Sequence, residues 1–131
     1  MPPSGPTFYV DESIYSKVLI ASLVAGGATV ERAGVAVPFG SDDETWLEVV
    51  GKMGWIALTR DKRIRYRTLE KQALVLHGVG AFTFNGGNAT AQTTAVRVLD
   101  LLPRMTEIAV SESRPFLYTF GTHGSLARVR L

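Results

Sequence analysis

Acidic side chains occur at three places in this sequence where a strand or loop gives way to the next element. Asp11 and Glu12 directly follow the apolar stretch "TFYV", and Asp61 comes two residues after the apolar stretch "WIALT". The third group lies in "SDDETWL" and consists of Asp42, Asp43 and Glu44. Carboxylates that lie together repel one another unless a cation lies between them, and their oxygen atoms suit Mg²⁺ or Mn²⁺. A cation held in this way polarises a phosphate and generates hydroxide from a bound water.

Strands that alternate with helices are needed to bring these acids together. β-Branched and aromatic residues predict strands at residues 7–10, 28–33, 55–59 and 81–84. Apolar residues at helical spacing predict four helices, the first capped by Ser13, the second starting near Asp42 or Asp43, the third at 69–76 and the fourth at 91–105. The tail "RPFLYTF" and "SLARVRL" predicts a β-hairpin.

This alternation predicts an α/β fold with a parallel sheet that helices cover on both faces. Ligands of such sheets bind at the carboxyl ends of the strands, where the strand order reverses. The first and third strands end in acids, and the second helix begins with them. We therefore expect three separate segments to deliver carboxylates to one pocket.

The overall composition is that of one domain. A chain of 131 residues that is 46% hydrophobic can bury an ordinary core, and we expect a flexible lead-in at residues 1–6 and a single domain at 7–131. The absence of cysteine excludes disulfides and thiolate metal sites and agrees with a reducing compartment. Because no stretch has membrane-spanning length and no secretory leader pattern opens the chain, we expect a cytoplasmic protein without a membrane partner.

Each acid also has a purely structural explanation. Helix capping suffices for Asp42 or Asp43, and Asp61 would end a strand and pair with a neighbouring cation on the surface. Asp11 is harder to explain in this way, because it stands directly after a buried strand at the usual ligand crevice of the sheet. The hypothesis of a metal site therefore rests on the joint pattern.

Cations are concentrated just after the third predicted strand. The net charge is only +2, but six of the 14 lysines and arginines lie between residues 60 and 71. This stretch is either a solvated turn or a rim that holds the phosphates of RNA or DNA beside the acids. In the second interpretation the phosphate-binding residues are Arg60, Lys62, Arg63 and Arg65, an arrangement that suits phosphodiester cleavage.

Three stretches in this order, "FYVDES", "PFGSDDETWLEVVGKMGWIALTRDKRIRYRTLEKQAL" and "RPFLYTF", resemble the PIN-like domain family, in particular the VapC-type ribonuclease toxins of bacterial toxin–antitoxin modules. The resemblance spans residue 7 to about residue 120. It implies a three-layer α/β/α domain with a mainly parallel central sheet and endoribonuclease activity that depends on Mg²⁺ or Mn²⁺. The implied partners are RNA and a cognate antitoxin, with the chain in a homodimer or a toxin–antitoxin hetero-oligomer.

The resemblance also implies which residues form the site. The three acids of the family fall on Asp11, Asp43 and Asp61, as catalytic metal ligands, and Glu12 is the frequent acidic neighbour. Asp42 is a local alternative to Asp43. Where better-known PIN nucleases commonly carry a fourth acid, this chain has Asn85, so the number of metals stays open, as does a catalytically inactive RNA- or antitoxin-binding domain.

A signalling receiver domain is a competing interpretation from another class. Such domains also carry acids after the first strand and a phosphoacceptor aspartate after the third, and Glu12 and Asp61 would take these roles. Receivers read the phosphoryl group with a lysine after the fifth strand, whereas this chain has no lysine after Lys71. The receiver interpretation would also leave Asp43 and the arginine-rich stretch without a purpose.

Overall fold

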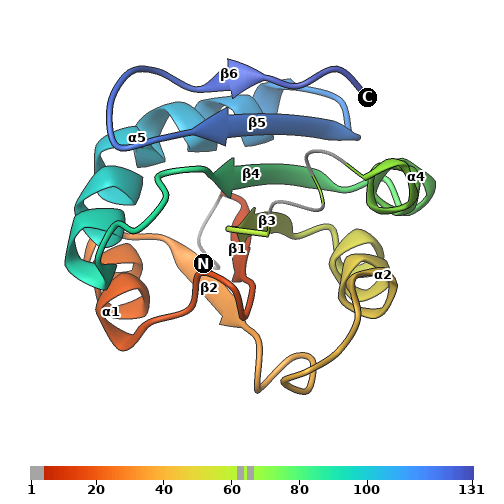
Figure 1. Ribbon diagram of the computed structural model, residues 1–131, viewed down its shortest axis with the longest axis horizontal. Helices are drawn as coiled ribbons and strands as arrows, with labels where there is room; N and C mark the ends of the chain where they lie inside the picture. Colours follow the sequence, from red (N-terminus) through yellow and green to blue (C-terminus); the bar gives the residue numbers. More distant parts are fainter. Residues whose placement is uncertain (1–4, 62–63, 65–66) are drawn as a thin grey trace.

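A mixed sheet runs through the centre of the molecule (Figure 1). The computed structural model describes residues 5–61, 64 and 67–131, and within them the sheet has six strands in the order β2-β1-β3-β4-β5-β6. β1 to β5 are parallel, and β6 pairs antiparallel with β5. The strands are β1 (Thr7–Val10), β2 (Thr29–Arg32), β3 (Ile56–Thr59), β4 (Gly80–Phe84), β5 (Phe116–Phe120) and β6 (Ala127–Arg128).

Helices cover both faces of the sheet, which confirms the predicted three-layer α/β/α architecture and the closing β-hairpin (Figure 1). α1 packs against α5 on one face, and α2 packs against α4 on the other. Alternation along β1 shows why the strand is apolar throughout: Phe8 and Val10 join one core, and Tyr9 joins the other. The helices are α1 (Lys17–Ala25), α2 (Asp43–Met53), α4 (Thr68–Leu76) and α5 (Ala91–Ser111).

The start of α2 matches the prediction closely. Asp42 is the N-cap, and its Oδ1 accepts the amide of Thr45 at 2.8 Å. Asp43 follows as the first residue of the helix, and Gly54 ends α2 in the left-handed conformation that glycine tolerates best, with φ 72°. Of the two adjacent aspartates, one is therefore occupied as a cap.

The predicted start of α1 was wrong. Ser16 is the N-cap, because its Oγ accepts the amide of Leu19 at 3.0 Å, while Ser13 lies earlier, in the turn that follows β1. The buried face of α1 carries Leu19 and Leu23, whereas Val18 is 38% exposed. The Ser13 hydroxyl instead donates to the Asp11 carboxylate and accepts the amide of Arg60.

α5 is longer than predicted. It continues past residue 105 to Ser111 with Pro103 inside it, because Ile108 and Ala109 extend the buried stripe beyond Met105. Among the described residues, no helix combines the length and the apolar character needed to cross a membrane. Most of the predicted lead-in at residues 1–6 lies outside the described residues.

Candidate active site

The candidate site lies where the strand order reverses. β1 has β2 on one side and β3 on the other, so the chain turns in opposite directions after its first and second strands. Asp11 follows the end of β1 and donates its amide to the carbonyl of Leu58 in β3 at 2.9 Å. Asp61 follows the end of β3 by two residues. The two aspartates thus occupy the reversal point of a parallel sheet, where such folds bind ligands.

Asp11 is a buried carboxylate with three hydrogen-bond donors. It is 6% exposed, and its Oδ2 accepts the hydroxyl of Ser13 at 2.5 Å, the hydroxyl of Thr59 at 2.9 Å and the amide of Ser13 at 3.3 Å. Removing a carboxylate from water is unfavourable unless hydrogen bonds replace those of the solvent. The donors therefore hold Asp11 in one orientation at the end of β1.

The same two hydroxyls fix the chain that leads to Asp61. The amide of Asp61 donates to Oγ1 of Thr59 at 3.1 Å, and the amide of Arg60 donates to Oγ of Ser13 at 2.9 Å. Sequence reasoning missed both residues: Ser13 was assigned to a helix cap, and Thr59 was counted only as a strand residue. A polar residue that closes the apolar run "WIALT" was the available signal for Thr59.

Glu12 turns away from Asp11 toward the loop before α2. Its Oε1 accepts the amide of Gly40 at 2.7 Å. Tyr9 lies beneath these acids in β1, and burial, together with the nearby charges of Asp11 and Glu12, raises the pKa of its phenol. Tyr9 therefore stays protonated and uncharged beside the two carboxylates at neutral pH.

Asp43 is joined to this edge by a stack of aromatic rings. Its Oδ1 accepts Nε1 of Trp46 at 3.0 Å, and Trp46 is only 3% exposed. The Trp46 ring stacks on Tyr9 with centroids 5.7 Å apart, and Tyr9 stacks in turn on Trp55 at 6.1 Å. Trp46 is part of the core and Trp55 is partly buried against it, and Trp46 adds an indole donor to a candidate ligand.

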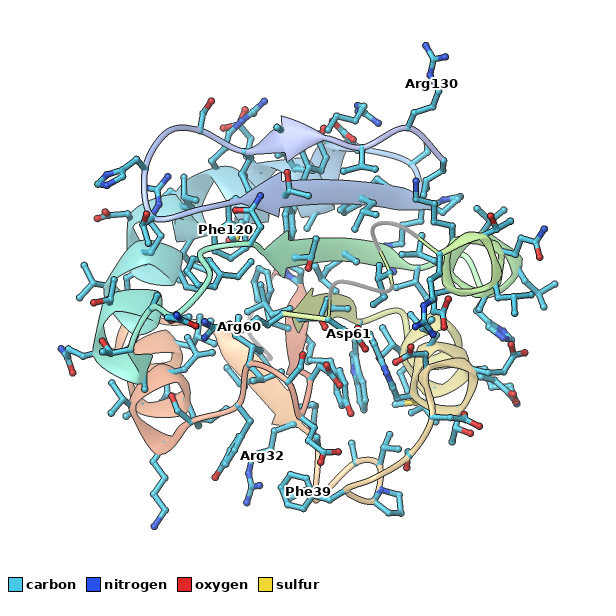
Figure 2. The ribbon with its side chains drawn as sticks, in the orientation of Figure 1. Arg32, Phe39, Arg60, Asp61, Phe120 and Arg130 are labelled. Carbon is cyan, nitrogen blue, oxygen red and sulfur yellow. The ribbon has the colours of Figure 1, made fainter. Side chains whose placement is uncertain are left out.

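Arg60 makes structural contacts within the molecule. Its guanidinium donates to the carbonyl of Gly87 and, at 3.4 Å, to that of Ala89, and it lies 5.2 Å from the centroid of the Phe84 ring. Figure 2 shows Arg60 and Asp61 projecting in different directions from the end of β3. The predicted phosphate-binding residues Lys62, Arg63 and Arg65 lie outside the described residues.

A small acidic pocket lies between the first turns of α2 and α4. Its volume is about 210 Å³, and its lining residues are Asp42, Asp43, Glu44, Leu69, Glu70 and Ala73. Oε2 of Glu70 is buried there and has no hydrogen-bond partner among the residues that the structure describes. Sequence reasoning did not single out Glu70, because one acid in the first turn of a helix is ordinary.

The carboxylates lie at the same end of the fold, but the described ones do not form a preformed metal site. Among the residues that the structure describes, which include every predicted acidic ligand, no group of three or more histidine, aspartate or glutamate side chains is arranged to hold a metal ion. Two contacts explain part of this separation, since Glu12 is held by the Gly40 amide and Asp43 by Trp46.

Comparison with known proteins identifies one family. The family model described as "PIN like domain" matches residues 6–86. This span runs from just before β1 to just after β4 and contains all of the predicted acidic residues. No curated protein and no solved structure matches the chain.

Proposed function

Because the chain belongs to the PIN-like domain family, whose fold is of the nuclease type, we propose that it is a metal-dependent endoribonuclease and the toxin of a toxin–antitoxin module. The observation that carries the proposal is the joint fixing of Asp11 and Asp61 at the reversal point of the sheet. Both are held through Thr59, whose hydroxyl contacts the Asp11 carboxylate and the Asp61 amide. The contact to Asp61 is made by its backbone amide, so it fixes the chain at position 61 directly beside the oriented Asp11 carboxylate.

The proposed metal ligands are Asp11, Asp43 and Asp61, with Glu12 beside them. Their carboxylate oxygens fit a hard cation such as Mg²⁺ or Mn²⁺, and the buried, unpartnered Oε2 of Glu70 in the pocket beside Asp43 fits one as well. Such a cation, when bound, supplies Lewis-acid chemistry to a phosphodiester and to water. Since the described acids do not yet form a three-ligand group, binding requires Asp43 or Glu12 to exchange its present hydrogen bond for the cation.

The residues of the chain have distinct tasks in this proposal. The hydroxyls of Ser13 and Thr59 keep the Asp11 carboxylate oriented, and the uncharged phenol of Tyr9 adds no negative charge below it. RNA phosphates would be held by the basic stretch, with Arg60, Lys62, Arg63 and Arg65 as the proposed residues. Arg60 would have to leave the carbonyls of Gly87 and Ala89 in order to do so.

The proposed setting is cytoplasmic. RNA is the substrate, a cognate antitoxin restrains the enzyme, and the chain acts as a homodimer or within a toxin–antitoxin hetero-oligomer.

The second candidate is a catalytically inactive PIN-like module that binds RNA or the antitoxin. The lack of a three-ligand group among the described residues favours it. A receiver domain shares the strand order 2-1-3-4-5, but the missing lysine after Lys71 argues against it.

Cleavage of RNA by the purified protein tests the proposal. The wild-type chain, Asp11→Asn and Asp61→Asn are incubated with RNA in Mg²⁺, Mn²⁺ or EDTA, and each variant is checked for cooperative thermal unfolding. Asp100→Asn is the matched control, because Asp100 is an exposed acid on α5 whose side chain is 65% accessible. We expect cleavage that needs the metal, disappears in both site variants and persists in Asp100→Asn.

Two other outcomes would contradict the proposal. If the folded wild-type protein neither cleaves RNA nor binds Mn²⁺ by calorimetry, the inactive binding module becomes the better account. If Asp11→Asn and Asp61→Asn fail to fold, the two carboxylates have a structural role.

A further inference from the structure

Two aromatic side chains and one arginine lie on the β2 side of the acids. Tyr15 belongs to the turn that begins at Asp11, since its amide donates to the Asp11 carbonyl at 3.0 Å. Phe39 lies in the loop before α2, and Arg32 ends β2. Figure 2 shows Arg32 and Phe39 projecting from the same end of the molecule. We call Tyr15, Arg32 and Phe39 the aromatic platform.

The three side chains of the aromatic platform contact one another. The ring of Phe39 meets the ring of Tyr15 edge-on, with centroids 6.1 Å apart and planes at 65°. The guanidinium of Arg32 lies 5.1 Å from the centroid of the same Tyr15 ring. Phe39 is nevertheless 54% exposed, whereas Arg32 is half-buried and its Nη1 donates to the Ala33 carbonyl at 3.2 Å.

The loop that carries Phe39 is held in place. The amide of Gly34 donates to the carbonyl of Val37 at 2.7 Å, and the hydroxyl of Ser41 donates to that of Pro38 at 2.7 Å. Gly34 has φ +89°, and a Cβ there would lie 2.4 Å from Cε2 of Phe39, so the ring packs closely on a glycine. The exposed ring is therefore positioned in advance and is not a loose side chain.

A direct contact places the aromatic platform beside the candidate site. Gly40, the residue after Phe39, donates its amide to the carboxylate of Glu12, the neighbour of Asp11. The loop that carries Phe39 is therefore next to the acids that would hold the phosphate of a bound nucleotide. Exposed aromatic rings bind unpaired bases by stacking, and arginine binds the linking phosphates.

We infer that the aromatic platform is a binding subsite for an unpaired nucleotide of single-stranded RNA, with the base stacked on Phe39 and a phosphate held by Arg32. This inference rests on the proposed ribonuclease function and deepens it, because it assigns the substrate a single-stranded region on the β2 side of the acids. Arg60, the first residue of the basic stretch, directly follows β3. The scissile strand then crosses the reversal point between Arg32 and the end of β3.

Equilibrium binding of RNA separates the contribution of base stacking to the affinity from that of the phosphate contact. A fluorescein-labelled single-stranded RNA of ten nucleotides is titrated with the protein in EDTA, and gel analysis verifies that the RNA stays intact. We expect Phe39→Ala to weaken binding about ten-fold, the lower part of the range for one lost base stack, with the salt dependence unchanged. Arg32→Gln should instead reduce the slope of log affinity against log salt by about 0.7, one single-strand phosphate contact.

Matched variants control for general effects. Phe39→Leu keeps an apolar side chain but lacks an aromatic face, and we expect it to bind like Phe39→Ala. Val110→Ala removes an apolar side chain on α5 that is even more exposed, at 72%, and Arg104→Gln removes an exposed arginine from the same helix. Both α5 variants should bind RNA like the wild-type chain.

Photocrosslinking locates the base directly. An RNA that carries 5-iodouridine is irradiated on the protein, and the attached peptide is identified by mass spectrometry. We expect attachment at Phe39 or Tyr15. Attachment only elsewhere, equal affinity of Phe39→Ala and wild type, or no RNA binding by the wild-type chain would each overturn the inference.

The subsite and the ribonuclease proposal can fail separately. Metal-dependent cleavage with an affinity that does not depend on Phe39 would leave the enzyme without this subsite. Conversely, Phe39-dependent binding without cleavage would leave the subsite on an inactive RNA-binding module.

Discussion

The hydroxyl of Thr59 donates a 2.9 Å hydrogen bond to the carboxylate of Asp11 and so joins the ends of β3 and β1. The same hydroxyl oxygen accepts the amide of Asp61 at 3.1 Å. Thr59 is completely buried, so water does not replace these contacts if they are lost. One uncharged side chain thereby sets the positions of two proposed metal ligands, and we regard Thr59 as a positioning residue.

Replacing Thr59 by valine keeps the shape of the side chain and removes its hydroxyl. Because a buried carboxylate loses one of its donors, we expect the free energy of unfolding to fall by about 1–3 kcal/mol. We also expect Mn²⁺ affinity and RNA cleavage to fall, and Thr59→Ser to restore both, since serine keeps the hydroxyl. Urea denaturation, calorimetry and a cleavage assay measure these effects.

Thr83 provides the matched control, because it is a buried threonine that pairs in register with Thr59 on β4. Thr83→Val should leave metal affinity near the wild-type value. Equal losses of metal affinity in the two valine variants would show that Thr59 has no specific positioning role.

Substitutions should distinguish the capping role of Asp42 from the proposed catalytic role of Asp43. Asn is as good an N-cap as Asp, so Asp42→Asn should retain both α2 and RNA cleavage, whereas Asp43→Asn should lose cleavage while the protein stays folded. Asp42→Ala should lower the melting temperature, because the amide of Thr45 loses its acceptor. Loss of cleavage in Asp42→Asn with retention in Asp43→Asn would reverse the assignment.

The lowered pKa of Asp42 also predicts that the stability of the protein falls at acidic pH. Hydrogen bonds from Thr45 lower the pKa of Asp42 below its ordinary value, so its contribution to stability is present above the pKa of the unfolded chain, near 4. This contribution is lost as the pH falls through the lower pKa of the folded state. Melting temperatures of the wild-type chain and Asp42→Ala should therefore converge below this range, and a constant difference down to pH 2 would contradict the prediction.

Trp46 tests whether the indole donor controls Asp43. Trp46→Phe keeps an aromatic ring against Tyr9 but removes the N–H that Asp43 accepts. If Asp43 is a ligand, this variant should change Mn²⁺ affinity, and Trp55→Phe, which alters the other side of the Tyr9 stack, should not. The chain has only these two tryptophans, so each single-tryptophan variant also reports by fluorescence which indole senses the metal. If Mn²⁺ changed the fluorescence of Trp55 alone, Asp43 would not be a metal ligand.

The apolar pattern of the sequence predicts the layers of the fold, but it does not fix where each helix begins. Alternation of apolar runs with helical spacing predicted the three layers and the parallel sheet, because burial on both faces makes such strands continuously apolar, as β1 is. The predicted cap of α1 was wrong because Ser13 and Ser16 are the same capping residue type, and the contact that occupies the Ser13 hydroxyl, with Asp11, is a tertiary feature of the site.

The side-chain contacts of the site could not be predicted from the sequence for a different reason. Thr59 and Asp11 are 48 positions apart, and their contact depends on the register in which β1 and β3 pair. Likewise, no local pattern shows that Arg60 reaches the carbonyls of the loop after β4. Residue types and spacing indicated which acids reach this edge of the sheet, but only tertiary geometry shows that they stand apart there.

Tyr9 predicts how stability changes at alkaline pH. Burial and the adjacent acids raise the pKa of its phenol in the folded protein, so above about pH 10 the tyrosine of the unfolded chain ionises first. The unfolded state then binds fewer protons than the folded state, and the free energy of unfolding falls as the pH rises. Tyr9→Phe keeps the ring but removes this titration, so its stability should decline less between pH 9 and about pH 11.

Urea denaturation of the two proteins across this pH range measures the difference between their slopes. Tyr118 also has a raised pKa, caused by burial and by its hydrogen bond to Glu112, so the Tyr9 variant should retain part of the decline. Tyr118→Phe serves as the comparison, and the double variant should show the flattest profile. Parallel profiles for wild type and Tyr9→Phe would mean that the phenol titrates alike in the folded and unfolded chains. Neither burial nor the acids at the end of β1 would then raise the pKa of Tyr9 in the folded protein.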